Sequence, residues 1–382
     1  MSGISGKYAI VGIGDSDVGR HLGRTGMALH LEAITRALGD AGLDKTAIDG
    51  LLTRPSHSSP QFNYSGVLAG RLGIAPTYFN DTALSGASSA FMIMEAVAAL
   101  EAGLCTVAIC VNGDAHGAGP RRGGITNWIE DFEKPYGMIG APESYALAAR
   151  RHMHEFGTTT EQFGAVAVAC RKHASLNPNA TFRTPISLAD HQASRFIAEP
   201  FRQLDCCPIT DGAGALIVTS AERARDMAKK PVYILGLGQG CTHSDLAYTP
   251  TMTTAAMRSS SERAYAMAKL GPKDIDVAEL YDCFTYVVLL TLEDYGFCAK
   301  GEGGAFVEDG RIELGGALPV NTGGGLLSQG HASGTLLLTE AARQMRGAAG
   351  ARQVADAETA IVSGQCAVNG INVCLILGRQ PN

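Results

Sequence analysis

Two short segments of small residues place a polar side chain where a long apolar helix is expected to begin. Leu84–Ser88 contains Ser85, and Gly330–Gly334 contains His331. The first amides of a helix have no partner within the helix, and they present a partial positive charge to whatever lies in front of them. A serine or histidine at such a point can act as a nucleophile, as a base or only as a helix cap.

Tyr281 is a third polar residue of interest, because it ends a short strand-like run in the second part of the chain. A helix cap is the default interpretation of a lone serine at a helix start. The combination of Ser85, His331 and Tyr281 at related loop ends favours a site that performs chemistry.

The elements that must position these residues occur twice. Tyr8–Gly14 is similar to Val232–Gly238, and the segment starting at Gly86 is similar to the one starting at His331, with Glu95 aligned on Glu340. Two more similar pairs occur in the same order: residues 41–53 with 270–282, and residues 108–113 with 360–365. Four ordered matches predict a duplicated α/β unit. We expect an N-terminal half over 1–230, with a loop insertion at about 114–205, and a C-terminal half over 231–382.

Each half alternates apolar strand-like and helical segments, which is typical of mixed or parallel sheets covered by helices. The helices after Ser85 and His331 are apolar on all sides, so we expect both to be buried at the centre of the protein, between two sheets. The pseudo-twofold symmetry of such a fold would bring their starting points together.

The bulk composition excludes several classes of protein. The 382 residues have a formal net charge of −6 and no long run of Lys or Arg, which argues against a nucleic-acid-binding surface. The 10 cysteines include no CxxC pair, so no metal site is predicted. Gly12 and Gly14 lack the third glycine of a dinucleotide-binding loop. Without a signal peptide or an apolar run of membrane-spanning length, we predict a soluble cytoplasmic protein.

Longer motifs carry a family resemblance over essentially the whole chain. Five segments resemble the C-terminal half of thiolases: Tyr281–Phe284, Leu292–Phe297, Gly301–Gly304, Leu318–Gly325 and Gly330–Gly334. Four others resemble the lipid-transfer-protein or sterol-carrier-protein-type thiolases: Met1–Gly14, Glu199–Arg202, Leu204–Cys207 and Thr210–Ala213. This resemblance implies two mixed five-stranded sheets in a five-layer α-β-α-β-α sandwich.

The resemblance also implies roles for single residues. Ser85 takes the place of the nucleophilic cysteine, and His331 matches the histidine that activates it. Cys366 matches the acid/base cysteine, within an altered loop. Tyr281 replaces an Asn or His that helps to form an oxyanion hole, to which backbone amides near Gly86 and Gly334 would contribute.

Serine at position 85 leaves three interpretations open. Ser85 and His331 can form a Ser–His nucleophile, Ser85 can be only a helix cap, or an engineered serine can stand where the natural protein has cysteine. A serine hydroxyl is far less acidic than a thiol, so it needs a base throughout the attack.

Three functions follow from the resemblance. The first is acyl transfer between a β-ketoacyl-CoA and CoA in the degradation of a bulky carboxylic acid. The alternative is a retro-aldol lyase that acts on a β-hydroxyacyl-CoA, because relatives that lack the nucleophile use tyrosines, one of them in a motif like Tyr281–Phe284. Their second tyrosine lies near the position of His331. The third is a non-catalytic lipid carrier or scaffold.

The resemblance also indicates partners. Coenzyme A would be a substrate and no cofactor would be tightly bound, while Arg121 and Arg122 are candidates for contact with its phosphates. We expect a homodimer. We also expect a small partner protein with an OB-fold and a zinc ribbon, giving a heterotetramer, since the usual long CoA-binding loop is not recognisable.

Overall fold

The computed structural model describes residues 3–117, 133–138, 140–227 and 229–381. Its strands are β1 (Tyr8–Asp15), β2 (Gly50–Thr53), β3 (Tyr78–Asp81), β4 (Val107–Ala115), β5 (Phe196–Ala198), β6 (Phe201–Arg202), β7 (Asp211–Ser220), β8 (Val232–Cys241), β9 (Val277–Glu279), β10 (Thr359–Cys366) and β11 (Ile371–Gly378). Its α-helices are α1 (Gly26–Ala41), α2 (Tyr64–Leu72), α3 (Ser88–Glu101), α5 (Ala141–Phe156), α6 (Thr160–Ser175), α7 (Leu188–Ala193), α8 (Ala221–Ala224), α9 (Met257–Ala268), α10 (Thr285–Asp294), α11 (Gly303–Phe306), α12 (Gly325–Ser328) and α13 (Thr335–Arg346). None of the described helices is long and apolar enough to cross a membrane.

Nine of these strands form one mixed sheet in the order β3-β2-β4-β7-β1-β8-β11-β10-β9. The two halves of the chain contribute five and four strands, and they join where β1 and β8 pair antiparallel over only two residue pairs. Strand β2 runs parallel to β3 and β4, and β9 runs parallel to β10. The alternation of strands and helices therefore produced the α/β fold that the sequence predicts.

The strand count of the second half differs from the expected five. Its fifth position holds only an isolated parallel bridge between Ala278 and Val320. The segment before this bridge is a series of turns rich in glycine, which disfavours an extended strand. Two five-stranded sheets were thus expected, and the described residues form a five-stranded part joined to a four-stranded part.

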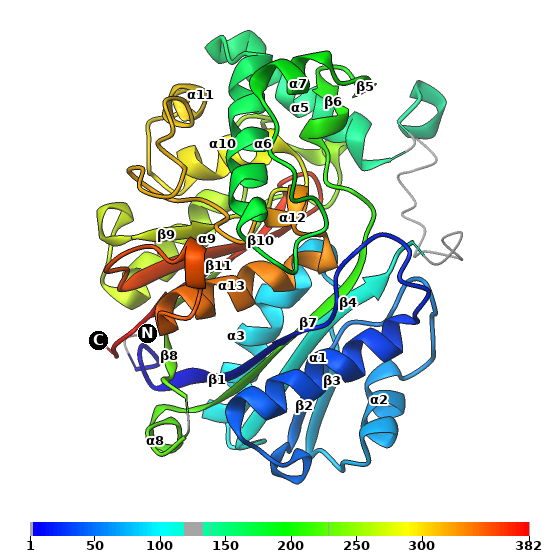
Figure 1. The fold of residues 1–382 in the computed structure, drawn as a ribbon, viewed down its shortest axis with the longest axis vertical. Helices are drawn as coiled ribbons and strands as arrows, with labels where there is room; N and C mark the ends of the chain where they lie inside the picture. Colours follow the sequence, from blue (N-terminus) through cyan, green and yellow to red (C-terminus); the bar gives the residue numbers. More distant parts are fainter. Residues whose placement is uncertain (1–2, 118–132, 139, 228, 382) are drawn as a thin grey trace.

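Helices α3 and α13 lie between the two parts of the sheet, as Figure 1 shows. Both contact strands of both halves, whereas α1 covers the outer face of β1 and β7, and α9 covers β8 and β11. Only Ala98 and Glu101 of α3 are exposed, and α13 has no exposed residue. The prediction of two buried central helices is confirmed.

The duplication appears in matched contacts. A Cβ atom at Gly14 would lie 2.3 Å from the Ala33 carbonyl oxygen of α1, and one at Gly238 would lie 1.8 Å from that of Ser260 in α9. These glycines therefore let each outer helix approach its strand, which explains why they do not form a dinucleotide loop. The boundary at 230/231 itself stays a prediction.

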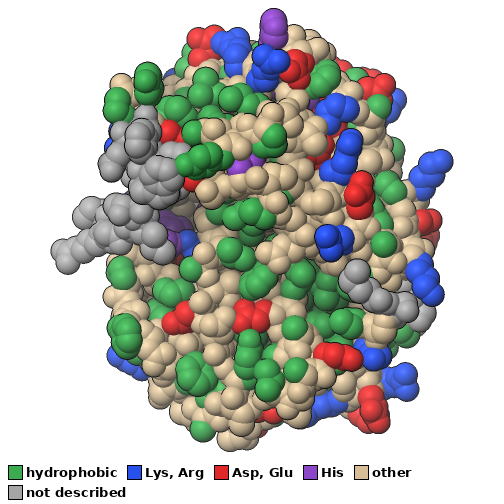
Figure 2. Space-filling view, turned by 180° about the vertical axis from the view of Figure 1, so that it is seen from behind, with side chains coloured by type: hydrophobic (Ala, Val, Ile, Leu, Met, Phe, Trp, Pro, Cys, Tyr) green, Lys and Arg blue, Asp and Glu red, His purple; other side chains and the backbone are tan. Residues whose placement is uncertain are grey.

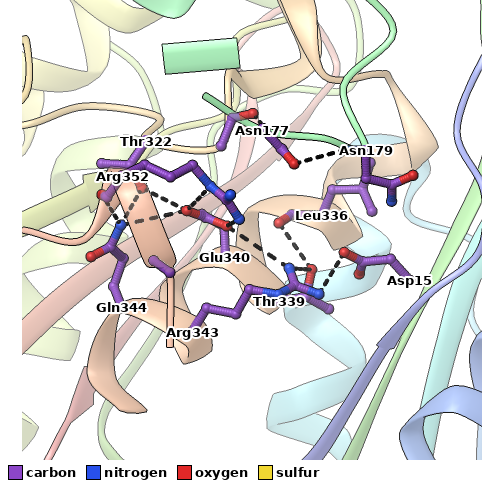
Figure 3. A network of polar contacts seen from close by, with 12 residues as sticks. Asp15, Asn177, Asn179, Thr322, Leu336, Thr339, Glu340, Arg343, Gln344 and Arg352 are labelled. Carbon is purple, nitrogen blue, oxygen red and sulfur yellow. Dashed lines mark hydrogen bonds and ion pairs between the residues drawn. The ribbon is translucent and has the colours of Figure 1, made fainter. Parts of the chain in front are cut away.

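The aligned glutamates also have matched roles. Glu95 of α3 accepts a hydrogen bond from Thr82 Oγ1 at 2.9 Å, and Glu340 of α13 accepts one from Thr322 Oγ1 at 3.1 Å. Figure 3 shows that Glu340 also receives a bidentate contact from Arg352, at 2.9 and 2.8 Å. These contacts fix each central helix to the loop beside it.

Residues 141–205 of the first half pack on the second half. Helix α6 contacts α10, α11 and α12, in the upper half of Figure 1. The buried His152 of α5 lies 3.0 Å from Glu293 of α10, and the buried His191 of α7 lies 2.8 Å from Asp205. These histidines are completely enclosed and hold helices together, so they are structural.

Candidate active site

The Tyr281 side chain lies between the starts of the two central helices. It follows β9, and its amide donates to Ser363 Oγ of β10 at 2.8 Å. A Cβ atom at Gly86 would lie 2.2 Å from the Tyr281 hydroxyl oxygen, and one at Gly334 would lie 3.0 Å from two ring carbons. The tyrosine therefore occupies space that exists only because both helix starts carry glycine.

His331 is the hydrogen-bond partner of Tyr281. Its Nε2 lies 3.2 Å from the Tyr281 hydroxyl, and its amide donates to Thr210 Oγ1 at 2.8 Å. The Ser333 amide donates to His331 Nδ1 at 3.4 Å, so in the neutral ring the proton belongs on Nε2. This assignment makes His331 a donor to the Tyr281 oxygen.

Ser85 is exposed and begins the short 3₁₀ helix η2 (Ser85–Ala87) in front of α3. Neither η2 nor α3 has a side-chain cap, and the Leu84 amide donates to the hydroxyl of Ser88 rather than to that of Ser85. The hydrogen bonds of the described residues include none between Ser85 and His331. The structure therefore shows neither the helix-cap role of Ser85 nor a Ser–His pair.

Cys366 is the side chain that Ser85 does reach. It ends β10 and is partly buried. Burial raises the pKa of the Cys366 thiol, while hydrogen bonds with Ser85 and with the Ala367 amide, together with the positive charge of Arg54, oppose that rise. A protonated thiol that can tolerate ionisation is suited to deliver a proton to carbon.

Backbone strain is concentrated in the loops around these side chains. Six non-glycine residues there have positive φ: Ser85, Ala332, Ser333, Ala367, Val368 and Asn369. They belong to η2, to the short helix η7 (Ala332–Gly334) and to the turn after β10. Residues in this region of φ cost free energy and are characteristic of functional sites.

Two further residues belong to the site, although no motif of the sequence indicates them. The Arg54 guanidinium is buried, with 8% of the residue exposed, and donates from Nη1 to Ser333 Oγ at 2.9 Å. The Asp114 carboxylate accepts from Ser56 Oγ at 2.7 Å and from the His57 amide at 2.6 Å, which fixes the loop that follows Arg54. The sequence does place both charged residues at the ends of buried strands: Arg54 directly follows β2, and Asp114 is the second-last residue of β4. This position was the feature that could have indicated them.

Tyr145 and Cys283 are buried polar groups near Tyr281. Gln365 donates from Nε2 to the Tyr145 hydroxyl at 2.6 Å, and Cys283 Sγ lies 3.7 Å from the same nitrogen. Burial raises the pKa of Cys283 to about 12 and raises that of Tyr145 well above its ordinary value. Both stay protonated and act as packing and hydrogen-bonding groups.

The neighbouring Asp282 does not orient Tyr281. Its carboxylate accepts from the Leu326 amide at 2.7 Å and so holds the start of α12. Burial raises its pKa to about 6. The role of Asp282 is therefore structural.

The remaining candidates have mixed outcomes. The Gly334 amide donates to the His331 carbonyl at 2.9 Å, so in this structure it is not free for an oxyanion. Gly86 as an oxyanion donor stays a prediction. Arg121 and Arg122 lie outside the described residues. No group of three or more His, Cys, Asp or Glu side chains that could hold a metal ion occurs within the described ranges.

Residues 238–379 match the family described as Thiolase C-terminal domain-like. Over 361 residues the chain is 39% identical to a 17-hydroxy-3-oxo-4-pregnene-20-carboxyl-CoA lyase of Mycobacterium tuberculosis, with 90% of this chain and 92% of the lyase covered. The chain belongs to the thiolase superfamily. Within it, the similarity to sterol carrier protein 2 confirms the predicted subgroup.

Other relatives of this thiolase-superfamily chain agree. It is 38% identical over 369 residues to a steroid side-chain-cleaving aldolase of Thermomonospora curvata, covering 91% of this chain and 92% of the aldolase. A solved Ltp2-ChsH2(DUF35) aldolase matches with a TM-score of 0.91 and 37% identity, over 98% of each chain. These relatives are named as a lyase and aldolases. Acyl transfer as the main activity is thus less well supported than the retro-aldol alternative.

Proposed function

We propose that this protein is a lyase that cleaves the Cα–Cβ bond of a β-hydroxyacyl-CoA in a retro-aldol reaction. The observation that carries the proposal is the buried Tyr281 hydroxyl, which lies 3.2 Å from His331 Nε2. A retro-aldol reaction needs a base for the β-hydroxyl group, and it needs no acyl-enzyme intermediate. Ser85, which is not hydrogen-bonded to His331, is therefore dispensable in this reaction.

The ionised Tyr281 oxygen is the base in this scheme, and the phenol first releases its own proton to solvent, against the rise in the pKa of Tyr281 that burial causes. It takes the proton of the β-hydroxyl group, whose oxygen becomes the carbonyl of the released ketone or aldehyde. The electron pair of the broken Cα–Cβ bond passes into the enolate of the thioester. His331 Nε2–H donates to the Tyr281 oxygen, so it stabilises the negative charge that makes this oxygen a base.

Cys366 completes the reaction. Its thiol protonates the enolate at Cα, which gives the shortened acyl-CoA, and the thiolate regains a proton from Tyr281 through solvent. Because burial raises the pKa of the Cys366 thiol, the thiol stays protonated until the enolate forms. Hydrogen-bond donors fixed at the enolate oxygen commonly lower the activation barrier by several kcal/mol in total, and a single donor contributes about 3 kcal/mol.

The relatives support this class of substrate and a partner. One is named for a 17-hydroxy-3-oxo-4-pregnene-20-carboxyl-CoA, and another is solved as an Ltp2-ChsH2(DUF35) aldolase. We therefore infer a bulky, alicyclic β-hydroxyacyl-CoA as substrate, and a small partner with an OB-fold and a zinc ribbon that helps to hold CoA. A cytoplasmic location stays a prediction.

A homodimer is also part of the proposal. Strand β3 is an edge strand of the nine-stranded sheet, and half of the Phe79 residue surface is exposed, at 51%. Figure 2 shows a face with many hydrophobic side chains across its middle and a few acidic ones among them, while most Lys and Arg side chains lie toward its edges. An edge strand and a face of low charge both favour association with a second copy.

A second function is favoured by one observation. Ser85 stands in front of α3 with φ of 46°, and it reaches Cys366. Acyl transfer through Ser85 would use this geometry, although no base is hydrogen-bonded to its hydroxyl within the described residues.

Product analysis by mass spectrometry tests the proposal. The protein, with and without its OB-fold partner, is given an alicyclic β-hydroxyacyl-CoA without free CoA. We expect equimolar ketone and shortened acyl-CoA. A second arm supplies a β-ketoacyl-CoA with free CoA. Two shorter thioesters in that arm, with no ketone in the first, would instead establish acyl transfer.

A further inference from the structure

Arg54 is a buried cation that the proposed reaction has not yet used. It follows β2 in the first half of the chain, and 8% of the residue is exposed. Burial lowers the pKa of its guanidinium, and the largest opposing influence is Tyr281, followed by Asp114 and Cys366. An arginine this deeply buried is costly to keep in a fold unless nearby groups compensate its charge.

Three contacts hold the Arg54 side chain and its loop in place. Nη1 donates to Ser333 Oγ at 2.9 Å, and Nη2 contacts His57 Nε2. The His57 amide in turn donates to the Asp114 carboxylate at 2.6 Å. The guanidinium is therefore fixed at both of its ends.

The Ser333 contact links Arg54 to the Tyr281–His331 pair. Ser333 lies in the strained turn η7 with φ of 51°, directly after His331 and Ala332. The Ser333 amide donates to His331 Nδ1, which is the contact that assigns the ring proton to Nε2. By holding the Ser333 hydroxyl, Arg54 holds the residue that orients the histidine.

The charge of Arg54 acts on both proton carriers of the site. It lowers the pKa of Tyr281 and that of Cys366, each of which burial raises. Within the described part of the chain, the other titratable groups that face Tyr281 include Cys283, Cys207, Cys366, Tyr145 and His331. Those that face Cys366 are Asp245, Tyr145 and Tyr281, and Ser85 is its hydrogen-bond partner. None of the thiols or phenols brings a positive charge, so Arg54 is the fixed cation of this set.

We infer that Arg54 is a positioning residue of the lyase. Through Ser333 it orients His331, and through its charge it makes negative charge tolerable first on the Tyr281 oxygen and then on the Cys366 sulfur. The expected effect of Arg54 on catalysis rests on the proposed retro-aldol function. The effect of Arg54 on the Cys366 thiol is independent of that function.

The experiment therefore measures the thiol and the reaction separately. The rate of Cys366 alkylation by iodoacetamide is followed against pH by peptide mass spectrometry in the intact protein, in Arg54→Met, in Arg54→Lys and in the control Arg150→Met. Arg150 is on the surface and pairs with Glu199. We expect the alkylation midpoint to move to higher pH in Arg54→Met, and to stay near the wild-type position in Arg54→Lys and Arg150→Met.

In the lyase assay, we expect Arg54→Met to lower kcat/KM by about tenfold or more at pH 7 and to move the rising limb of the pH profile to higher pH. Added guanidinium ion should restore part of the activity. If Arg54→Met does not fold, Arg54→Gln takes its place in both profiles. Ser333→Ala keeps the charge of Arg54 and tests only the positioning of His331, so we expect it to lower lyase activity and leave the alkylation midpoint unchanged.

The two hypotheses fail in different ways. An unchanged alkylation midpoint in Arg54→Met, or in Arg54→Gln when that variant must decide, would overturn the electrostatic role of Arg54, whatever the reaction. A shifted midpoint in a protein without lyase activity would keep the electrostatic role of Arg54 and reject the proposed function.

Discussion

The Tyr281 hydroxyl lies 3.2 Å from His331 Nε2, and its ring is enclosed between Gly86 and Gly334. One of these glycines begins the central helix segment of the first half, and the other begins that of the second half. The phenol is thus held by both copies of the duplicated unit. In the proposed lyase, the duplication provides a buried base at the point where the two helix starts meet.

Replacing His331 tests whether Tyr281 needs a donor beside its oxygen. We expect His331→Phe to lower kcat by about 10²- to 10⁴-fold, because the phenyl ring cannot stabilise charge on the phenol oxygen. His331→Tyr should retain much more activity, since it returns a hydroxyl donor where the resemblance implies a second tyrosine in aldolases. Steady-state kinetics of the two variants, which differ by one hydroxyl group, measures the effect. Equal activity in both would contradict this role of His331.

The glycines around Tyr281 provide a second prediction. Gly86→Ala should nearly abolish activity, because its Cβ atom would lie 2.2 Å from the Tyr281 hydroxyl and 2.5 Å from the Gln365 carbonyl oxygen. Gly334→Ala should also reduce activity, since its φ of 78° adds strain. The control is Gly39→Ala in α1, where the Cβ atom meets nothing within 4 Å. That variant should keep full activity and gain up to about 1 kcal/mol of stability.

Asp114 should make stability depend on acid pH. Its pKa is lowered from 3.8 to about 2 although burial opposes the change, because His116, Ser58, Ser56 and the Ala115 amide favour the carboxylate. At about 1.36 kcal/mol per pKa unit, this corresponds to about 2 kcal/mol. The folded pKa is below the unfolded one, so this stabilisation is present above about pH 4 and is lost as the pH falls through about 2.

Asp114→Asn tests that pH dependence. Urea unfolding at several pH values should show the variant less stable by about 2 kcal/mol at pH 7, and the difference should shrink as the pH falls below about 4. A difference that does not change with pH would show that the ionised carboxylate is not what holds the loop after Arg54.

The homodimer can be tested at the sheet edge. Phe79→Lys introduces a charge on β3, which should weaken association and raise the dimer dissociation constant by about tenfold or more. Sedimentation velocity across a dilution series measures it. Leu176→Lys, an exposed position after α6, is the control and should leave the assembly unchanged. Wild type that is monomeric at all concentrations would reject the homodimer.

The sequence predicted the duplicated architecture well, because periodic apolar runs and repeated motifs determine which helices are buried. The two helix starts with Ser85 and His331, and the strand end with Tyr281, do meet in the fold. The absence of a fifth strand at Val320 in the second half could not be predicted. A single bridge between two residues leaves no alternating pattern of apolar and polar residues in the sequence.

The site itself was only partly predictable. The choice between Ser85 and Tyr281 as the reacting group depends on which one contacts His331, and that distance depends on turns with positive φ at Ser85 and Ser333. Arg54 lies 279 positions from Ser333 in the chain, so its contact with the site follows from the tertiary fold and from no local motif.

The most direct test of the account compares Tyr281→Phe with Ser85→Ala in one assay. Ketone release from the alicyclic β-hydroxyacyl-CoA is followed without free CoA and with the OB-fold partner present, and Tyr265→Phe, which loses a buried hydroxyl bonded to the Tyr295 carbonyl, serves as control. We expect Ser85→Ala and Tyr265→Phe to retain activity, whereas Tyr281→Phe should lose about 10²- to 10⁴-fold. Activity that survives in Tyr281→Phe and disappears in Ser85→Ala would contradict it.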